Sequence, residues 1–570
     1  MSRQTSESTR PSGLARFVPI LGWLPSYDRS WLRPDLIAGV TVAALVVPKS
    51  LGYASIAGVP IEYGLYAAAA GAIIYALFGT SRQIAVGPSS AVSAVAGGAV
   101  VAAGLSGNDE AVVLVASISI VTGLLFLLLA LFKMGWMSQF LSKAVITGFL
   151  FGAAIEVVVG ELPKLTGTEA EGANAWQKLW SWLASLSETD PATLAVGVVS
   201  LAVVVGLRFV APAIPGALVL VVGGLMASEV FGLGDKGVAL VGDVPRGLPN
   251  LAFPDLEFVW ANIAAIMAAS IGLLLIGFSQ SAGNARAFAS KHRYRIDINQ
   301  ESVAQGMCNV GSGLVQGIPV ATSLSASSLN DSSGAKTPVA SLTTGVMVIL
   351  TLLILAPLLS GLPKAVLGAL IIDAVVFGMM NVKEMRRLRH VARVDFWIAI
   401  AAIVGVVLAG VLAGVVIGVV LSLGWLIYVS AMPKMPVLGH KRGTQVWHGV
   451  DDYPDSTTYP GLVVLRFDAG LFFASSDALE DRLRELRLQA EVDPHTVVID
   501  CEGINFIDSQ GSGTIAEIVG IAASQGIEIR LARLKTNVRL VLEREGVVEA
   551  IGEDHIYGNV YRAAADLIPD

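Results

Sequence analysis

Long runs of apolar residues, separated by short polar loops, make up most of the first 430 residues of the chain. A helix needs about 20 mainly apolar residues to cross the hydrocarbon of a bilayer. Measured against this length, the runs predict fourteen full or broken spans in two sets of seven, over 33–232 and 258–430. The spans are expected near 33–57, 60–79, 88–104, 110–133, 138–159, 191–209, 214–232, 258–284, 296–316, 322–333, 337–358, 364–381, 394–409 and 412–430.

The third span of each set is interrupted by glycine and proline. Gln83 to Ser93 reads QIAVGPSSAVS, and Gln316 to Ser328 reads QGIPVATSLSASS. Each stretch predicts a few extended residues followed by a short helix, whose first N–H groups lack intrahelical partners and attract anions. Exposed backbone is tolerated in a membrane only where it lines a protein cavity, so the pair predicts an anion site at the midplane between two inverted repeats. The alternative is that each proline merely kinks an ordinary transmembrane helix.

Clusters of basic residues test this count of spans. The N-terminal segment, the loop over 286–295 and the loop over 383–393 are rich in Arg and Lys, which predicts that all three are cytoplasmic. Eight and then four predicted spans separate them. An even number of spans returns the chain to the same face of the membrane, so the count agrees with the charges. The acidic loop from Glu161 to Asp190 falls on the opposite face, and both chain ends are expected in the cytoplasm.

Composition changes after the last predicted span. Residues 1–32 are expected to form a cytosolic segment without a signal peptide, 33–431 the transmembrane domain and 432–446 a linker. From residue 447 to 570 charged residues return, and strand patterns alternate with amphipathic helices, which predicts a small cytosolic α/β domain. Its strands are expected at 461–468, 495–501 and 526–532, with helices at 475–489, after Asp508 and at 536–545.

The whole composition fits a membrane protein and disfavours several functions. Hydrophobic residues make up 54% of the chain and charged residues only 15%, whereas about a quarter of residues in soluble domains are charged. The predicted fold class is therefore an α-helical polytopic membrane protein. The six His and two Cys residues show no metal-ligand spacing, and no nucleophile and base pair occurs. We expect neither a cofactor nor a metal, no enzymatic activity and no nucleic-acid partner.

Four stretches of the chain resemble one known family. VVPKSLGYASIAGVP (46–60), SRQIAVGP (81–88), ARAFASKHRYRIDINQE (285–301) and the C-terminal domain are similar to the SulP (sulfate permease) family of anion transporters. The resemblance implies two inverted repeats of seven segments, a core domain (segments one to four and eight to eleven) and a gate domain from the rest. It also implies a C-terminal STAS domain, a homodimer in the plasma membrane, and transport by movement of the core against the gate.

Three departures from the family pattern bear on the site. Lys49 follows the proline of the first span, where the family usually has Gln or an acidic residue. The Ser-Phe-Ser-Arg-Ser run of many members is replaced by 323–327, SLSAS, so Ala326 stands where the arginine would be. Gln280 replaces a carboxylate of the eighth segment. A charged side chain inside a membrane is costly unless it is paired or faces a cavity, so we expect Lys49 to supply the positive charge of the site. The alternatives are that desolvation leaves Lys49 neutral or that it pairs with Glu156 or Asp373.

These considerations give a candidate site and a set of open questions. With Gln280 and Asn284 in place of an anionic ligand, sodium coupling is not expected, while Glu156 stays a candidate proton carrier. Sulfate is the family's usual substrate, with bicarbonate, dicarboxylates and chloride as alternatives. An anion sensor that signals to a cytosolic partner through the STAS domain is the alternative from another class. Gln510 stands at the position that accepts phosphate in related regulators, so a phosphorylation switch is not expected. The predicted substrate-binding residues are Lys49, Tyr53, Ser89, Ser90, Gln280, Ser281, Asn284, Ser325 and Ala326.

Overall fold

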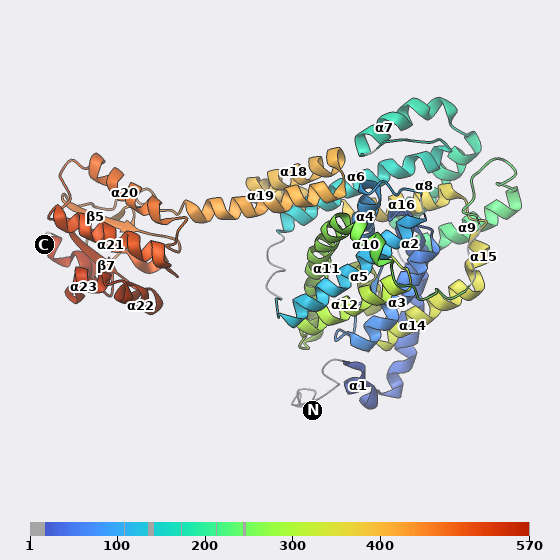
Figure 1. Cartoon of the computed structure of the whole chain (residues 1–570), viewed down its shortest axis with the longest axis horizontal. Helices are drawn as coiled ribbons and strands as arrows, with labels where there is room; N and C mark the ends of the chain where they lie inside the picture. The colour runs from blue at the N-terminus through green and yellow to red at the C-terminus, as the bar shows by residue number, and fades with distance from the viewer. Residues whose placement is uncertain are drawn as a thin grey trace. The chain divides into compact units, whose positions relative to one another are not determined.

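A computed structural model describes residues 18–107, 109–134, 142–172, 174–211, 214–242 and 247–568. The chain forms two compact units, Met1–Ser422 and Leu423–Asp570, and the division falls within the last long helix (Figure 1). The first unit is almost entirely helical, and the second contains a parallel sheet.

Each of the fourteen predicted spans coincides with a helix among the described residues, and the last of these helices continues into the second unit. The first set comprises α2 (Leu32–Ile56), α3 (Glu62–Phe78), α4 (Ser90–Ala102), α5 (Glu110–Leu131), α6 (Lys143–Thr166), α8 (Pro191–Val210) and α9 (Gly216–Phe231). The second set comprises α11 (Ile263–His292), α12 (Ile298–Leu314), α13 (Leu324–Ser332), α14 (Val339–Leu350), α16 (Lys364–Met379), α18 (Arg393–Ala409) and α19 (Val411–Ala431). Among the described residues, seven helices are long and apolar enough to cross a membrane, and several shorter apolar helices lie beside them.

Some boundaries differ from the predicted ones. The fifth span was expected at 138–159, but α6 runs from Lys143 to Thr166, and 135–141 lie outside the described residues. The eighth span begins at Ile263, after the short helix α10 (Leu256–Ala261), and continues to His292. The polar loops also contain helices that the apolar pattern did not indicate, α7 (Ala175–Ala184) and α17 (Val382–Val391).

Helix packing follows the symmetry that two inverted repeats require. Helix α5 packs on α12 as α14 packs on α3, and α2 packs on α14 as α11 packs on α5. These contacts are close: a Cβ atom on Gly123 of α5 would lie 2.6 Å from the carbonyl oxygen of Gly306 on α12. A second group of helices is built the same way, since α6 packs on α18 as α16 packs on α8. We call α2–α5 with α11–α14 the core, and α6, α8, α9, α16, α18 and α19 the gate.

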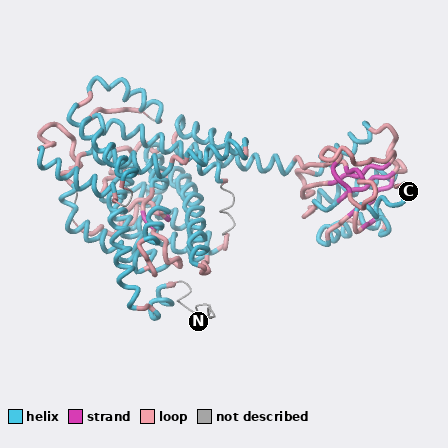
Figure 2. The backbone as a smooth tube through the Cα atoms, turned by 180° about the vertical axis from the view of Figure 1, so that it is seen from behind, coloured by secondary structure: helices cyan, strands magenta, loops and turns pink. Residues whose placement is uncertain are grey.

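The two broken spans meet inside the core. Strand β1 (Val86–Gly87) pairs antiparallel with β2 (Ala321–Thr322), Val86 opposite Thr322 and Gly87 opposite Ala321 (Figure 2). The interior of the core offers no water to the extended backbone, so its N–H and C=O groups need partners in the protein. The pairing of the two strands supplies these hydrogen bonds. Helices α4 and α13 start directly after the two strands, so both N-termini lie near the same point of the core.

A buried carboxylate on α12 holds the turn that leads into the first broken span. Glu301 on α12 accepts hydrogen bonds from the Tyr75 hydroxyl (2.8 Å), the Thr80 amide (2.7 Å), the Thr80 hydroxyl (2.6 Å) and the Ser81 amide (3.2 Å). Its side chain therefore fixes the turn between α3 and β1 to the other repeat. Because four donors are held by one side chain, the loss of Glu301 leaves several buried polar groups without partners.

A second buried carboxylate, on α2, holds the segment that follows α13. Asp35 on α2 accepts hydrogen bonds from the Lys336 amide (2.6 Å), the Thr337 amide (3.1 Å), the Thr337 hydroxyl (2.6 Å) and the Tyr27 hydroxyl (3.2 Å). Each broken span is thus held by an acidic side chain from the opposite repeat.

The second unit has the predicted α/β pattern. Its parallel sheet has the order β5 (Leu462–Arg466), β6 (Thr496–Asp500), β7 (Glu528–Ala532) and β8 (Ile556–Tyr557). The helices are α20 (Ser476–Gln489), α21 (Ser509–Ser524), α22 (Thr536–Arg544), α23 (Val547–Ile551) and α24 (Val560–Ala564). Asp508 caps α21 by accepting a hydrogen bond from the Gly511 amide at 2.8 Å, as expected. A hairpin of β3 (Leu438–His440) and β4 (Trp447–Gly449) occupies much of the segment expected to be a linker.

Candidate functional site

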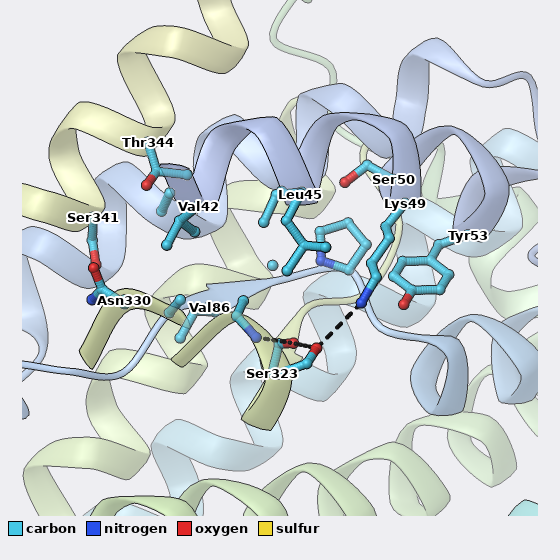
Figure 3. A pocket seen from close by; sticks show the side chains of 17 residues that line it. Val42, Leu45, Lys49, Ser50, Tyr53, Val86, Ser323, Asn330, Ser341 and Thr344 are labelled. Carbon is cyan, nitrogen blue, oxygen red and sulfur yellow. Dashed lines mark hydrogen bonds between the residues drawn. The ribbon is translucent and has the colours of Figure 1, made fainter. Parts of the chain in front are cut away.

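A narrow cavity lies where α2, the β1 segment and the start of α13 meet (Figure 3). Its volume is about 20 Å³, roughly the space of one water molecule. Four predicted site residues line it: Lys49, Tyr53, Ser325 and Ala326. Since α2 belongs to one repeat and α13 to the other, the cavity is shared by both.

Lys49 points across the cavity toward α13. Its Nζ donates a hydrogen bond to the Ser325 Oγ at 3.3 Å (Figure 3). Neither of the alternative partners considered for it takes this ammonium. Asp373 is held by Arg208, whose Nε and Nη2 donate to the two carboxylate oxygens at 3.0 and 2.6 Å, and Glu156 lines a different cavity. In the described part of the chain Lys49 has no carboxylate at ion-pair distance, so its charge is available to an anion.

The ion pair of Arg208 and Asp373 lies on the gate helices α8 and α16, near Lys49 but outside the cavity lining. Both members interact electrostatically with Lys49, and Asp373 also interacts with Tyr53. The guanidinium of Arg208 stacks 4.4 Å from the ring centroid of Phe377. Because the pair is neutral overall, Lys49 determines the net charge of this region.

The two helix N-termini are not equivalent. Ser89, at the N-cap of α4, makes no capping hydrogen bond, and its buried Oγ has no partner. At α13 the Ser323 Oγ accepts a hydrogen bond from the Ala326 amide at 3.3 Å. The expectation that the Ala326 N–H is free for an anion therefore needs correction, because the N-cap serine already engages it. The first backbone N–H groups of α4 are therefore more available to an anion than those of α13.

Other predicted residues do not line the cavity. Ser89 and Ser90 are absent from its lining, which includes Gly87 and Pro88 just before them. Gln280, Ser281 and Asn284 do not line the described cavity either. The Ser281 hydroxyl lies 2.9 Å from the Thr322 hydroxyl, so α11 packs against the far side of β2.

Sequence reasoning missed five polar residues that line the cavity, which are Ser50, Ser323, Asn330, Ser341 and Thr344. The buried Ser50 Oγ has no hydrogen-bond partner, and neither has the Asn330 Oδ1. The Asn330 Nδ2 donates to the Gln83 carbonyl at 3.0 Å, which fixes the amide's orientation. Buried polar atoms are nearly always paired, so orphaned groups in a cavity indicate room for a polar ligand or water. The only sequence signal for Ser50 is its position next to Lys49.

The described residues contain no group of three or more His, Cys, Asp or Glu side chains placed to hold a metal ion. The geometry offers one ammonium group and hydroxyl groups around one small cavity, and an uncapped helix N-terminus that directly follows Gly87 and Pro88 of its wall. These groups stabilise negative charge.

Comparison with known proteins agrees with this chemistry. The model of the Sulfate permease family matches residues 32–402. The chain belongs to the sulfate permease family. The STAS domain model matches residues 453–563 of this family member. It is 33% identical over 547 residues to a Mycobacterium tuberculosis protein named "Probable sulfate transporter", with 94% of this chain and 96% of the relative covered. It is 29% identical to "Sulfate transporter 4.1, chloroplastic" of Arabidopsis thaliana, with 96% of this chain and 82% of the relative covered.

Solved structures share the fold. The murine Solute Carrier 26 family member A9 anion transporter is 22% identical with a TM-score of 0.89, and the match covers 99% of this chain and 96% of that one. The transmembrane domain of a cyanobacterial bicarbonate transporter, BicA, is 22% identical with a TM-score of 0.59, covering 68% of this chain and 98% of that one. This family member is therefore a multi-pass membrane anion transporter with a C-terminal STAS domain, and it is not an enzyme.

Proposed function

We propose that this protein carries sulfate across the plasma membrane as a secondary transporter and a homodimer, with both chain ends in the cytoplasm. The observation that supports it best is Lys49, an ammonium without a carboxylate partner, opposite the start of α13 in a cavity shared by both repeats. Relatives matched over nearly the whole chain carry the name sulfate transporter. Bicarbonate, dicarboxylates and chloride are the alternative substrates.

In this proposal the anion binds between the ammonium of Lys49 and the N-terminus of α4. The hydroxyls of Ser50 and Ser325 donate to its oxygens. Binding replaces the Lys49–Ser325 hydrogen bond and widens the small cavity. The anion then moves with the core, while the gate, including the Arg208–Asp373 pair, stays in place. The positive charge stays on the core because Lys49 lies on α2.

Uptake of radiolabelled sulfate into proteoliposomes that contain the purified full chain tests this function. We expect saturable uptake that unlabelled sulfate inhibits more strongly than chloride, bicarbonate or a dicarboxylate does. Stronger inhibition by one of these anions, together with its own uptake, would identify that anion as the substrate. Anion binding without uptake of any of them would indicate a sensor instead.

We expect uptake not to depend on sodium. The two carboxylates that brace the core, Asp35 and Glu301, each already accept four hydrogen bonds, and Gln280 and Asn284 carry no charge. A coupled cation in a membrane usually binds an acidic side chain. Replacing external sodium by an organic cation at fixed pH should leave the initial rate unchanged. A several-fold fall would reveal a cation site in the chain.

A contact between core and gate gives a test of their relative movement. Lys164 on α6 donates to the Ser55 Oγ on α2 at 2.9 Å and to the Glu161 Oε1 at 2.9 Å. These residues line a cavity of about 240 Å³ between the two helix groups, together with Ser106. If the core moves against the gate, this contact must break. In the Lys164→Met variant the cavity should therefore be open for a larger fraction of the time.

Reactivity of a cysteine at position 106 measures this opening. In a Ser106→Cys background, Lys164→Met should raise the rate of labelling by a membrane-impermeant maleimide several-fold, whereas both native cysteines are buried. Lys178→Met is the matched control, since Lys178 lines the same cavity and no described hydrogen bond joins it to α2. Equal labelling rates with and without Lys164→Met would contradict the proposed movement at this contact.

A further inference from the structure

The second unit contains an apolar cavity that the transport site does not use. It has a volume of about 210 Å³ and lies between α20, α21 and the sheet. Each strand from β5 to β7 contributes one branched side chain to its wall. The apolar lining residues are Val463, Leu483, Leu486, Pro494, Val497, Ile518, Ile521, Ala522, Ile527 and Ile529.

The cavity is open to solvent, and the Ile521 side chain on its wall is 43% exposed. An apolar group that binds there removes apolar surface from water, which favours binding by about 25 cal/mol for each Å² buried. Ten of the lining residues are apolar, so the cavity is suited to an apolar group.

The lining also includes the polar side chains of Glu480, Arg484, Arg487 and Gln525, and the two arginines differ in their partners. Arg484 donates a hydrogen bond to the Glu480 carboxylate and lies 3.6 Å from an Asp481 oxygen, so its charge is balanced. Arg487 donates to the Gln525 Oε1, which is a neutral amide. Within residues 247–568, all of which are described, no carboxylate lies at ion-pair distance from Arg487. Its guanidinium is thus an unbalanced cation in the lining of the cavity.

We propose that this cavity binds a medium-chain aliphatic carboxylate, with the chain between α20 and α21 and the carboxylate on Arg487. A guanidinium binds a carboxylate through two parallel hydrogen bonds, and Gln525 turns aside to release it. A cavity of about 150 Å³ takes benzene, which has six carbons, so about 210 Å³ takes a chain of roughly eight. The aliphatic chain matches the apolar walls, which disfavour a small inorganic anion. The carboxylate matches the guanidinium of Arg487, which favours an anionic ligand over a neutral one.

Photoaffinity labelling of the full chain in nanodiscs tests this site. The probe is octanoic acid with a diazirine near the end of its chain, and labelled peptides are mapped by mass spectrometry. We expect saturable labelling of peptides from α20 and α21, which excess octanoate abolishes and octanol at the same concentration leaves largely intact. Ala522→Phe and Ile521→Trp, which fill the cavity, should each reduce labelling at least five-fold. Partition of the probe into lipid is the same for every variant.

Arg487→Gln should reduce labelling several-fold, whereas Arg482→Gln should not. Arg482 lies on the same helix, pairs with Glu485 and does not line the cavity, so it is the matched control. Thermal unfolding of each variant identifies any that fail to fold. Equal competition by octanol and octanoate, or no saturable labelling in the folded wild-type chain, would overturn the proposal.

Discussion

Lys49→Gln is expected to weaken sulfate binding by about 1.5–3 kcal/mol, the contribution of one hydrogen bond to a charged group. This corresponds to a roughly ten- to hundred-fold higher dissociation constant, because each 1.4 kcal/mol is a factor of about ten. The reason is that Lys49 provides the unbalanced positive charge of the cavity, since Arg208 is neutralised by Asp373. Isothermal titration of the purified protein with sulfate measures the effect.

Two further variants separate charge from shape at this position. Lys49→Glu should bind sulfate more weakly than Lys49→Gln, since it places like charge beside the anion. Ala326→Arg in the Lys49→Gln background should recover part of the affinity, because Ala326 lines the same cavity from the opposite repeat. If Lys49→Gln leaves the affinity unchanged while Asp373→Asn destabilises the fold, Lys49 belongs to a structural charge cluster and not to the anion site.

Glu301→Ala is expected to destabilise the helical unit strongly. It removes the acceptor of four hydrogen bonds, and each buried donor left unpaired costs about 1–3 kcal/mol. The midpoint of thermal unfolding in detergent should fall by roughly 8 °C or more, given at least about 1 kcal/mol for each of the four donors and about 2–4 °C for each kcal/mol. Glu301→Gln keeps an acceptor oxygen and should lie between the wild-type chain and Glu301→Ala.

Glu257→Ala is the control for this prediction, since Glu257 lies exposed at the start of the short helix α10. Its midpoint should stay within about 1 °C of the wild-type value, as is usual for surface substitutions. The turn that Glu301 holds leads directly into β1, so folded Glu301→Ala protein should also bind sulfate more weakly. An unchanged midpoint for Glu301→Ala would show that other contacts hold this turn.

The sequence patterns were sufficient for the order of the helices and for the two broken spans. Apolar run length predicted each span, and Gly87 with Pro88 marked the point where α4 begins. Family resemblance, not periodicity, supplied the grouping into core and gate. The β3–β4 hairpin was missed because its short strands contain His440 and Trp447 among polar neighbours and lack an alternating pattern.

The cavity wall was harder to predict because it depends on contacts between distant parts of the chain. The partner of Asp373 is Arg208, 165 residues away, and no local pattern relates the two. Gln280 and Asn284 lie on α11, which packs against β2, and neither of them lines the cavity. Asn330 lines the cavity only because α13 folds back beside β1, where the Gln83 carbonyl holds its amide.

The position of a bound anion tests the central claim most directly. Selenate has the shape and charge of sulfate, and its selenium gives an anomalous diffraction signal. In crystals grown with selenate, we predict one strong anomalous peak within hydrogen-bonding reach of the Lys49 Nζ, between the N-termini of α4 and α13. A selenate peak elsewhere in the helical unit, with none beside Lys49, would contradict the account.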